Sequence, residues 1–551
     1  MMKRAFIALA LLWAHLAGAA TYYAAPGGGS SASCVDNSAN VCTVDRARVV
    51  SADGDTVILS AGTYPSNELG SSGYLLISSE NQSWQCVTAG ACTFAPSGTS
   101  VSGIRMNSPT TTSVTFSGIV IDGSSATSMD QCFYLSDGAA KYTVSITDVA
   151  CKDPSIYGIR VQANELDLTV TDTVMTASTS VTPRSFLWTN TSYTEGTIAV
   201  SGGSATIAQY DDSGTAVIDI NTNDAGQSFS LDNFSIDVSS DETVASGNHN
   251  GVVVRNISGA SITNSTITIN GNYGTVGALA ILCYSTGAIS SAGCVIDGNT
   301  ITLGVTTGQA ASVGWDQSSA GDGYSADGTI SNNNITCTVD GTDIHGVGFF
   351  WSGRGRGYRN KVTNCGIGLL SKGQDVGATH ASSIVIGAWN QYLYSKGSAG
   401  AVFANIVAVV NNSSGTPVVC GVDGARDCTN TSLVNSIFYA DGGQPSVLLN
   451  TASGQTFSLV TANDWYGFSA PVWTYLGADY ESLSAWNAAG VVGDDLSTDP
   501  QFVAPGTDYR LNPTSPLRRA GVCYLTTGCV YPDYRGYRGR VPPDIGAYQR
   551  N

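Results

Sequence analysis

Short apolar stretches alternate with polar turns along the middle of the chain, and the alternation recurs. A phrase with an apolar residue on either side of Asn, Asp, Gly or Ser begins at residues 262, 296, 330 and 358, in steps of 34, 34 and 28 residues. Weaker copies begin at residues 146, 170, 200 and 231. Self-similarity with such a period is typical of solenoids, propellers and arrays. The chain is therefore predicted to be built from repeats.

Each repeat favours strands over helices. β-branched residues follow each phrase, as in Ile267-Thr-Ile269, and a second apolar run lies upstream, as in Gly251-Val-Val-Val254. Short alternating runs broken by Asn, Gly and Ser predict strands with turns. No helix of about 10–12 residues fits between them, which excludes helical arrays, and the variable repeat length argues against a propeller. We therefore predict an all-β, single-stranded parallel β-helix, in which one coil corresponds to one repeat.

The polar residues of the phrase predict where each coil turns. Asparagine and glycine accept left-handed backbone angles more readily than other residues. Asn264, Asn332 and Asn360 are therefore predicted to form one corner that recurs from coil to coil.

The chain has 14 cysteines, all of them beyond the N-terminal apolar segment. In an exported protein an even number in close pairs indicates disulfides rather than a metal site or a catalytic thiol. Cys337 and Cys365 are separated by 28 residues, the same step as one repeat, so they should lie on neighbouring coils. We expect seven bridges: Cys34 with Cys42, Cys86 with Cys92, Cys132 with Cys151, Cys283 with Cys294, Cys337 with Cys365, Cys420 with Cys428, and Cys523 with Cys529.

The N-terminus predicts export. Lys3-Arg4 is a basic region, residues 5–16 are apolar, and Ala17-Gly-Ala19 is a cleavage signal, so residues 1–20 are interpreted as a signal peptide. The apolar run is too short to span a bilayer. The formal net charge of −18 argues against binding to nucleic acid or to an anionic membrane. We expect a secreted or periplasmic monomer with no membrane span.

Both ends of the chain carry recognisable sequences. A short helical pattern over Val44–Val50 is followed by Gly54-Asp-Thr-Val-Ile-Leu-Ser-Ala-Gly-Thr-Tyr64, and the chain ends with Asp499-Pro-Gln-Phe-Val503, Asp508-Tyr-Arg-Leu511 and Asp544-Ile-Gly-Ala-Tyr548. These segments resemble those of secreted right-handed parallel β-helix proteins of the pectate-lyase-like (pectin lyase fold) superfamily, including the tail that closes many bacterial members. Leu517-Arg-Arg519 and Gln549 depart from that tail.

The resemblance and the repeats together imply a domain organisation. Residues 21–115 are expected to form an N-terminal cap and first irregular coils, residues 116–464 the parallel β-helix, and residues 465–551 a C-terminal capping segment. An open solenoid end exposes apolar surface and strand edges, which is why caps are expected.

Aromatic and basic residues follow successive strands in the middle of the chain. Aromatic rings stack on sugars, and cations bind uronate or sulfate groups. The expected substrate-binding residues are Tyr284, Trp315, Trp351 and Lys396. The resemblance implies polysaccharide-lyase chemistry, in which a cation neutralises the uronate carboxylate and a base removes the C5 proton. The catalytic candidates are Lys372 or His345 as base and Arg354 and Arg356 for the carboxylate.

Several alternatives remain open. The aromatics could pack turns, and the cations and the histidine could be solvated loop residues. The resemblance also suggests calcium, for which Asp316, Asp322 and Asp327 are candidate ligands, although solvated loop acids are the favoured interpretation. A non-catalytic glycan-binding or adhesion protein would need no active site. A glycoside hydrolase would need paired carboxylates; Asp211-Asp212 and Asp494-Asp495 are present, but the other motifs of polygalacturonase-like members are missing.

Overall fold

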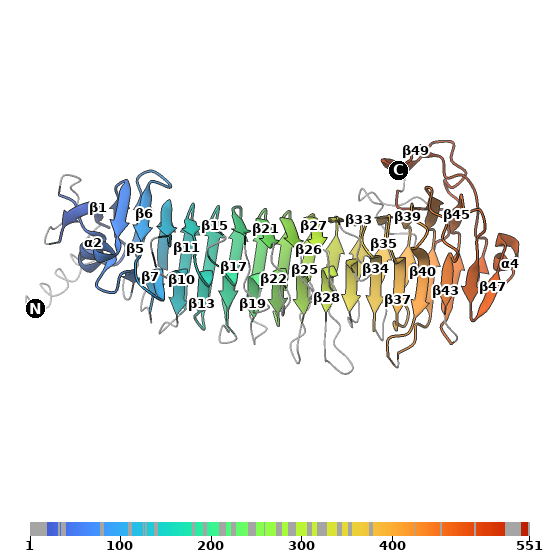
Figure 1. Cartoon of the computed structure of the whole chain (residues 1–551), viewed down its shortest axis with the longest axis horizontal. Coiled ribbons are helices and arrows are strands. Elements are labelled where there is room, and N and C mark those ends of the chain that lie inside the picture. The colour runs from blue at the N-terminus through green and yellow to red at the C-terminus, as the bar shows by residue number, and fades with distance from the viewer. Residues whose placement is uncertain are drawn as a thin grey trace, which may run out of the picture. The chain divides into compact units, whose positions relative to one another are not determined.

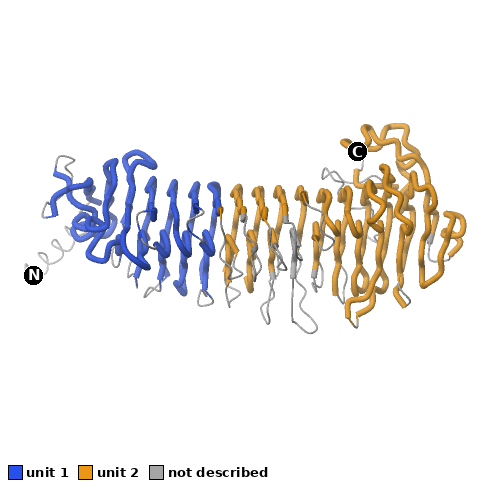
Figure 2. Tube along the Cα trace, viewed as in Figure 1, with its two compact units in different colours: residues 1–207 blue, residues 208–551 orange. Residues whose placement is uncertain are grey.

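The structure is a computed structural model, and the chain divides into two compact units, residues 1–207 and 208–551 (Figure 2). The described residues are 19–30, 34, 40–77, 82–107, 113–124, 126, 129–136, 141–178, 181, 183–190, 195–208, 216–221, 227–240, 249–257, 259–271, 278–284, 294–305, 311–316, 328–338, 344–350, 355–373, 378–424, 426–451, 454–489, 492–523 and 542–548.

Unit 1 is a parallel β-helix in which successive strands join three sheets in turn, here named A, B and C (Figure 1). Sheet A contains β1 (Thr21–Gly29), β2 (Thr56–Leu59), β5 (Gln82–Cys86), β8 (Ser113–Ser117), β11 (Tyr142–Thr147), β14 (Leu166–Thr171) and β17 (Gly196–Ser201). Sheet B contains β3 (Gly62–Pro65), β6 (Cys92–Ala95), β9 (Ile119–Asp122), β12 (Ala150–Lys152), β15 (Val174–Ala177) and β18 (Ser204–Ile207). Sheet C contains β4 (Leu75–Ile77), β7 (Val101–Met106), β10 (Met129–Ser136), β13 (Tyr157–Gln162) and β16 (Ser185–Thr189).

Unit 2 repeats this plan. Its strands of sheet A are β20 (Gln227–Asp232), β23 (Gly259–Thr263), β26 (Cys294–Asp297), β29 (Thr329–Ser331), β32 (Arg356–Tyr358), β35 (Thr379–Ala381), β38 (Val402–Ala404), β41 (Thr431–Val434), β44 (Phe457–Thr461) and β48 (Val492–Gly493). Sheet B contains β21 (Ser235–Ser240), β24 (Thr266–Gly271), β27 (Thr300–Val305), β30 (Asn334–Cys337), β33 (Lys361–Thr363), β36 (Ile384–Ile386), β39 (Val407–Val410), β42 (Ile437–Ala440) and β45 (Asp464–Tyr466).

Sheet C of unit 2 contains β19 (Ala216–Asn221), β22 (His249–Arg255), β25 (Ala278–Tyr284), β28 (Ala311–Asp316), β31 (His345–Phe350), β34 (Ile367–Lys372), β37 (Gln391–Lys396), β40 (Thr416–Gly421), β43 (Leu449–Thr451) and β46 (Trp473–Tyr475). Apart from the antiparallel pair of β46 with β47 (Ala478–Tyr480), the pairings in this sheet are parallel. The predicted all-β parallel β-helix is therefore confirmed.

The strand register confirms most of the repeat and corrects one step. Ile262 pairs with Ile296, which pairs with Ile330, as predicted. Tyr358, however, pairs with Ser331 rather than with Ile330. The repeat is one residue shorter there, so the left-handed corner, which Asn264 and Asn332 occupy with φ of 51° and 56°, falls on Arg359 with φ of 56°. The prediction for Asn360 is wrong.

Asn360 instead belongs to a ladder of buried amides inside unit 2. The side chains of Asn299, Asn333 and Asn360 are at most 1% exposed. Asn299 Nδ2 donates to Asn333 Oδ1 at 3.0 Å, and Asn333 Nδ2 donates to Asn360 Oδ1 at 3.0 Å. The same oxygens accept backbone N–H groups of the preceding coil. Buried polar groups need hydrogen-bond partners, and each amide oxygen provides one for the backbone N–H at the corner of the preceding coil.

A short helix lies at the start of unit 1, as the sequence predicts. Helix α2 (Val44–Val50) begins after Thr43, whose hydroxyl accepts the Arg46 N–H at 3.2 Å. Val44 and Ala47 are buried where α2 packs against β1 and β2. The other described helices are α3 (Ser66–Leu69) and α4 (Leu483–Asn487). In the part of the chain that the structure describes, no helix is long and apolar enough to cross a membrane.

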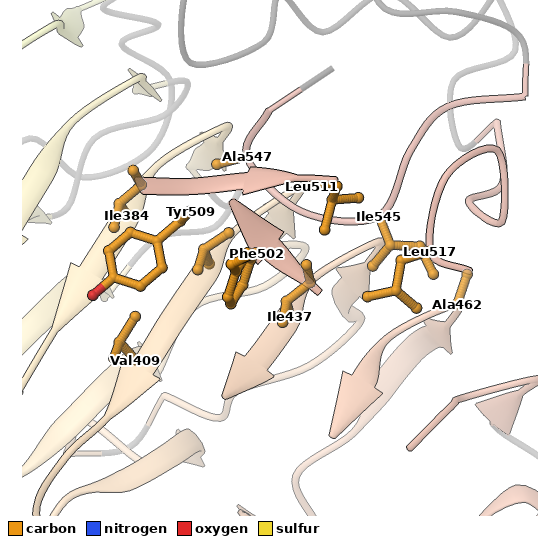
Figure 3. Close-up of a cluster of buried hydrophobic side chains, with 11 residues drawn as sticks. Ile384, Val409, Ile437, Ala462, Phe502, Tyr509, Leu511, Leu517, Ile545 and Ala547 are labelled. Atoms are coloured by element: carbon orange, nitrogen blue, oxygen red, sulfur yellow. The ribbon is translucent and has the colours of Figure 1, made fainter. Parts of the chain in front are cut away.

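The C-terminal segment of unit 2 folds back along the side of its own β-helix. Its antiparallel strands β49 (Phe502–Ala504) and β50 (Asp508–Leu511) lie over sheet B (Figure 1). The buried cluster, here named the strap core, joins both layers (Figure 3): Ile384, Val407, Val409, Ile437, Ala462, Phe502, Tyr509, Leu511, Leu517, Ile545 and Ala547. The aliphatic side chains on the outside of sheet B are thereby removed from water.

Tryptophans gather at the end of unit 2 around a buried carboxylate. Trp473 stacks on Trp486 of α4 with 5.9 Å between ring centroids. Asp495 accepts the indole N–H groups of Trp465 and Trp486 at 3.0 and 3.1 Å. It also accepts two N–H groups of Asn463. Its side chain is 2% exposed. This carboxylate of the Asp494-Asp495 pair therefore links Asn463, Trp465 and Trp486 by hydrogen bonds.

Six of the seven expected disulfides are confirmed: Cys34–Cys42, Cys86–Cys92, Cys132–Cys151, Cys283–Cys294, Cys337–Cys365 and Cys420–Cys428. Cys529 of the seventh pair and most of the expected signal peptide lie outside the described residues. Disulfides persist in oxidising compartments, so the six bridges indicate an extracytoplasmic protein.

Candidate functional site

A single register row of sheet C contains four of the candidate residues of unit 2, namely Tyr284, Asp316, Lys372 and Lys396. We name it the lysine row. Each member is the backbone partner of the next: Arg255, Tyr284, Asp316, Phe350, Lys372 and Lys396. Neighbouring strands are about 4.8 Å apart, so a linear polymer laid across the strands would meet these positions in order.

Lys372 and Lys396 are direct register partners. The residues before them, Ser371 and Ser395, face the interior and are 0% exposed, and side chains alternate along a strand, so both lysines are on the outer side. A glycine follows each lysine, with φ of 65° at Gly373 and 59° at Gly397. These left-handed residues turn the chain after each lysine, which explains the repeated Ser-Lys-Gly.

Asp423, which the sequence did not single out, lies beside this pair. Its Oδ1 is 4.0 Å from Lys372 Nζ, and both side chains are about one fifth exposed, at 20% and 23%. Asp423 is held by two backbone hydrogen bonds with Arg426, whose side chain donates to the Gly373 carbonyl. A Cβ at Gly397 would lie 2.6 Å from the Asp423 Cβ. The glycine thus allows the carboxylate to approach the lysine pair.

Tyr394 is a second residue that the sequence reasoning missed. It is half-buried, and its hydroxyl lies over Gly421, where an added Cβ would be 3.1 Å from the oxygen. Burial and the nearby Asp423 carboxylate raise the pKa of the Tyr394 hydroxyl above its ordinary value. The phenol therefore stays protonated at neutral pH and is able to donate a proton or a hydrogen bond.

His345 begins β31 on the same sheet, and the charges of both lysines affect its pKa. Burial, followed by the charges of Lys372 and Lys396, lowers the pKa of the imidazole to about 3. The ring is therefore neutral at physiological pH. A catalytic base works best with a pKa near the working pH, so His345 is better suited to hydrogen bonding than to removing a proton.

The remaining candidates do not join the lysine row. Trp315 lies in the neighbouring register row with Cys283, Phe349 and Ser371. Arg356 is exposed on β32 of sheet A, so it belongs to a different sheet from Lys372. Trp351 and Arg354 lie outside the described residues.

The calcium candidates stay a prediction. Asp316 is in β28, whereas Asp322 and Asp327 lie outside the described residues. Among the described residues, no group of three or more His, Cys, Asp or Glu side chains is arranged to hold a metal ion. We therefore derive no step of a reaction from calcium.

Comparisons with known proteins leave the activity open. No protein-family model and no curated protein matches the sequence. Among solved structures, the chain is similar to pectate lyase Pel9A, with 14% identity over 96% of each chain and a TM-score of 0.26. It is also similar to the A-module of mannuronan C-5 epimerase AlgE6 from Azotobacter vinelandii, with 14% identity over 67% of this chain and 90% of that one and a TM-score of 0.32.

A third similar structure is the PL6 family polysaccharide lyase Pedsa3628 from Pseudopedobacter saltans, with 10% identity, coverage of 85% and 94%, and a TM-score of 0.27. Such low identities and TM-scores assign neither an activity nor a residue role. The parallel β-helix is established by the strand pairing, and membership of the pectate-lyase-like superfamily stays a prediction.

Proposed function

We propose that the chain is a secreted carbohydrate-active protein that cleaves a uronate-containing polysaccharide by β-elimination at the lysine row. The observation that carries the proposal is the stacked pair of Lys372 and Lys396, register partners on one outer face of a chain with 42 acidic and 24 basic residues. Two stacked lysines in such a chain form a local site for a carboxylated polymer.

The residues of the site supply complementary roles. Lys396 as an ammonium binds the uronate carboxylate and stabilises the negative charge that develops when the C5 proton leaves. Lys372 in its neutral form takes that proton on Nζ, the C5–H electron pair forms the C4–C5 double bond, and the C4–O bond breaks. The departing oxygen takes a proton from the Tyr394 phenol or from water. Asp423 positions Lys372.

Lys372 is assigned as the base in preference to His345 because burial and the charges of the two lysines hold the pKa of His345 well below neutral. The lowered pKa of His345, about 3, makes the imidazole a weak acceptor for a carbon acid proton at neutral pH. His345 is instead assigned to hydrogen bonding within the site. Tyr284, in the same row, is assigned to sugar contact.

The test is an assay of the mature protein on pectate, alginate, glycosaminoglycans and ulvan-type glycans, with and without calcium. Elimination creates an unsaturated uronate, which absorbs in the ultraviolet. Lys372→Ala should abolish that absorbance while glycan retention on an affinity gel largely persists, and Lys396→Ala should both raise KM and lower kcat, because Lys396 binds the carboxylate and stabilises the developing charge. Lys361→Ala removes a lysine from sheet B of the same unit and is the matched control.

Each outcome separates the candidate functions. A full rate for Lys372→Ala refutes its assignment as base. New reducing ends without ultraviolet absorbance would mean hydrolysis. Binding without either product would mean a non-catalytic glycan-binding or adhesion protein.

A further inference from the structure

A second row of side chains, on the outer face of sheet C in unit 1, alternates between arginine and aromatic residues. We name it the arginine–aromatic row. Arg105 on β7 pairs with Tyr134 on β10, which pairs with Arg160 on β13, which pairs with Trp188 on β16. The flanking positions on these strands are buried, so the four half-buried side chains share the outer face.

The rings and guanidinium groups of this row are stacked. The Arg105 guanidinium carbon is 4.8 Å from the centroid of the Tyr134 ring, and that of Arg160 is 5.3 Å from the same ring on the next strand. Arg160 is also 5.6 Å from Trp188, which stacks on Tyr157 at 5.3 Å. Cation–π contacts hold a guanidinium by its face, leaving its N–H groups directed around the edge.

Neither arginine has an anionic partner in the described part of the chain. Within the described residues of unit 1, the ion pairs are formed by Arg48 and Lys141. The Nε atoms of Arg105 and Arg160 are buried and have no hydrogen-bond partner among the described residues. In a chain of net charge −18, these two arginines of one row, two strands apart, are not paired with a carboxylate of the described residues.

We propose that the arginine–aromatic row is a binding site for a linear carboxylated polysaccharide, laid across the strands of unit 1. Because Nε is buried in both residues, each guanidinium donates two parallel N–H bonds from its two Nη atoms to one carboxylate, a paired arrangement that suits arginine. The two arginines are two strands apart, about 10 Å, so they hold two carboxylates of one chain. A compact anion would reach only one of them.

The aromatic members prepare the site. The Tyr134 hydroxyl donates to the Gln162 side-chain oxygen on the next strand, and this bond fixes the ring between the two arginines. Tyr157 stacks on one face of the Trp188 ring and holds it in place. Because the guanidinium groups are already held in place, little rotamer entropy is lost when a glycan binds.

This site is independent of the proposed catalysis at the lysine row. A purely non-catalytic protein could use it, and a lyase could use it to hold polymer. The experiments therefore measure binding at unit 1 separately from turnover.

The first experiment uses the unaltered chain and hydroxyl-radical footprinting of Tyr134 and Trp188. Saturating polyuronate should slow the oxidation of both residues about threefold or more, as expected when a ligand covers half-buried rings. The same polysaccharide with its carboxyl groups reduced to alcohols should give no protection. Equal protection by the reduced polymer, or none by polyuronate, overturns the proposal.

The second experiment measures affinity for polyuronate with the arginines changed. Arg105→Gln and Arg160→Gln should each weaken binding by about tenfold, the loss expected for one charge-assisted pair. Lys152→Gln, which removes an exposed charge from sheet B of unit 1, should leave the affinity within about twofold. Arg160→Lys keeps the charge but not the paired N–H groups, and should bind more weakly than wild type.

Turnover distinguishes this failure from failure of the proposed function. On short uronate oligosaccharides at saturation, the arginine variants should keep the wild-type rate of unsaturated uronate formation. Lys372→Ala should lose that rate and keep the footprint on Tyr134. Folded Arg105→Gln and Arg160→Gln variants that bind polyuronate as wild type does would refute the site, whatever the result of the lyase assay.

Discussion

Replacing Asp464 by asparagine should make the stability of unit 2 less dependent on pH. Asp464 begins β45, and its side chain is 0% exposed. One carboxyl oxygen accepts the Thr498 N–H at 2.7 Å, and the other is buried without a partner among the described residues. Burial, reinforced by the charges of Asp495 and Asp499, raises the pKa of Asp464 from 3.8 to about 7.

The sign of the effect follows from proton uptake. Between about pH 4 and pH 7 the folded chain keeps a proton on Asp464 that the unfolded chain has lost, so the free energy of unfolding falls as the pH rises through this window. A difference of about 3 pH units corresponds to a loss of ~4 kcal/mol, complete above pH 7. Asparagine does not ionise and escapes this loss.

The assay is guanidinium unfolding of both chains at about pH 4 and about pH 8, followed by tryptophan fluorescence. Trp465, Trp473 and Trp486 lie at the same end of unit 2 and report its unfolding. Relative to wild type, Asp464→Asn should gain up to ~4 kcal/mol between the two pH values. Any cost of burying the new amide is the same at both pH values and cancels.

Asp479→Asn removes an exposed carboxylate near the same chain end and serves as the control. A stability difference between wild type and Asp464→Asn that does not change with pH would refute the reasoning, because the carboxyl group would then titrate alike in both states.

Three further predictions concern the fold. Asn333→Ala should lower the free energy of unfolding by several kcal/mol, roughly 1–3 for each buried group left unsatisfied. Asn332→Gly should lower it by less than about 1 kcal/mol, because the φ of 56° at this position suits glycine. Denaturant midpoints compare the two variants, and equal losses would contradict the amide ladder. Phe502→Ala should cost about 3–5 kcal/mol and open the C-terminal segment to limited proteolysis, while an unchanged digestion pattern would argue against the strap core. Replacing Cys337 and Cys365 together by serine should cost about 3–4 kcal/mol, since the bridge spans 28 residues, and an unchanged melting temperature would contradict this.

The periodicity predicted the fold because strand-forming runs and corner residues recur along the chain. It failed at Tyr358, where the coil is one residue shorter and Arg359 takes the left-handed position. In both coils the buried asparagine comes directly after the corner residue: Asn333 follows Asn332, and Asn360 follows Arg359. The repeats should therefore have been aligned with Asn360 opposite Asn333.

The site was only partly predictable from sequence, because the face on which a side chain lies changes with every residue along a strand. Trp315 and Tyr284 were grouped as aromatics, although the register places them in adjacent rows. Asp423 lies in a turn after β40 that is closed by backbone hydrogen bonds with Arg426, and none of the repeated phrases of the sequence indicated it. Arg105 and Arg160 are far apart in sequence, and only the strand pairing brings them to one row.

The sequence of the strands in sheet B indicated that the C-terminal segment or another layer covers them. Residues 384–386 and 407–410 are continuous aliphatic runs, and strands that are buried on both faces read in this way. That pattern indicates a covering layer. The segment that supplies the layer is far along the chain, and its packing was not deducible from local sequence.

The most direct test of the lysine row is a double-mutant cycle on Lys372 and Lys396, measured as the affinity for a thio-linked uronate oligosaccharide that resists elimination. Because the two lysines are register partners about 4.8 Å apart, they should bind one ligand as a unit. Each single variant loses some binding free energy, and the sum of the losses in Lys372→Ala and Lys396→Ala should differ from the loss in the double variant by at least ~0.5 kcal/mol. Strictly additive losses, or no loss in Lys396→Ala, would contradict a shared uronate site.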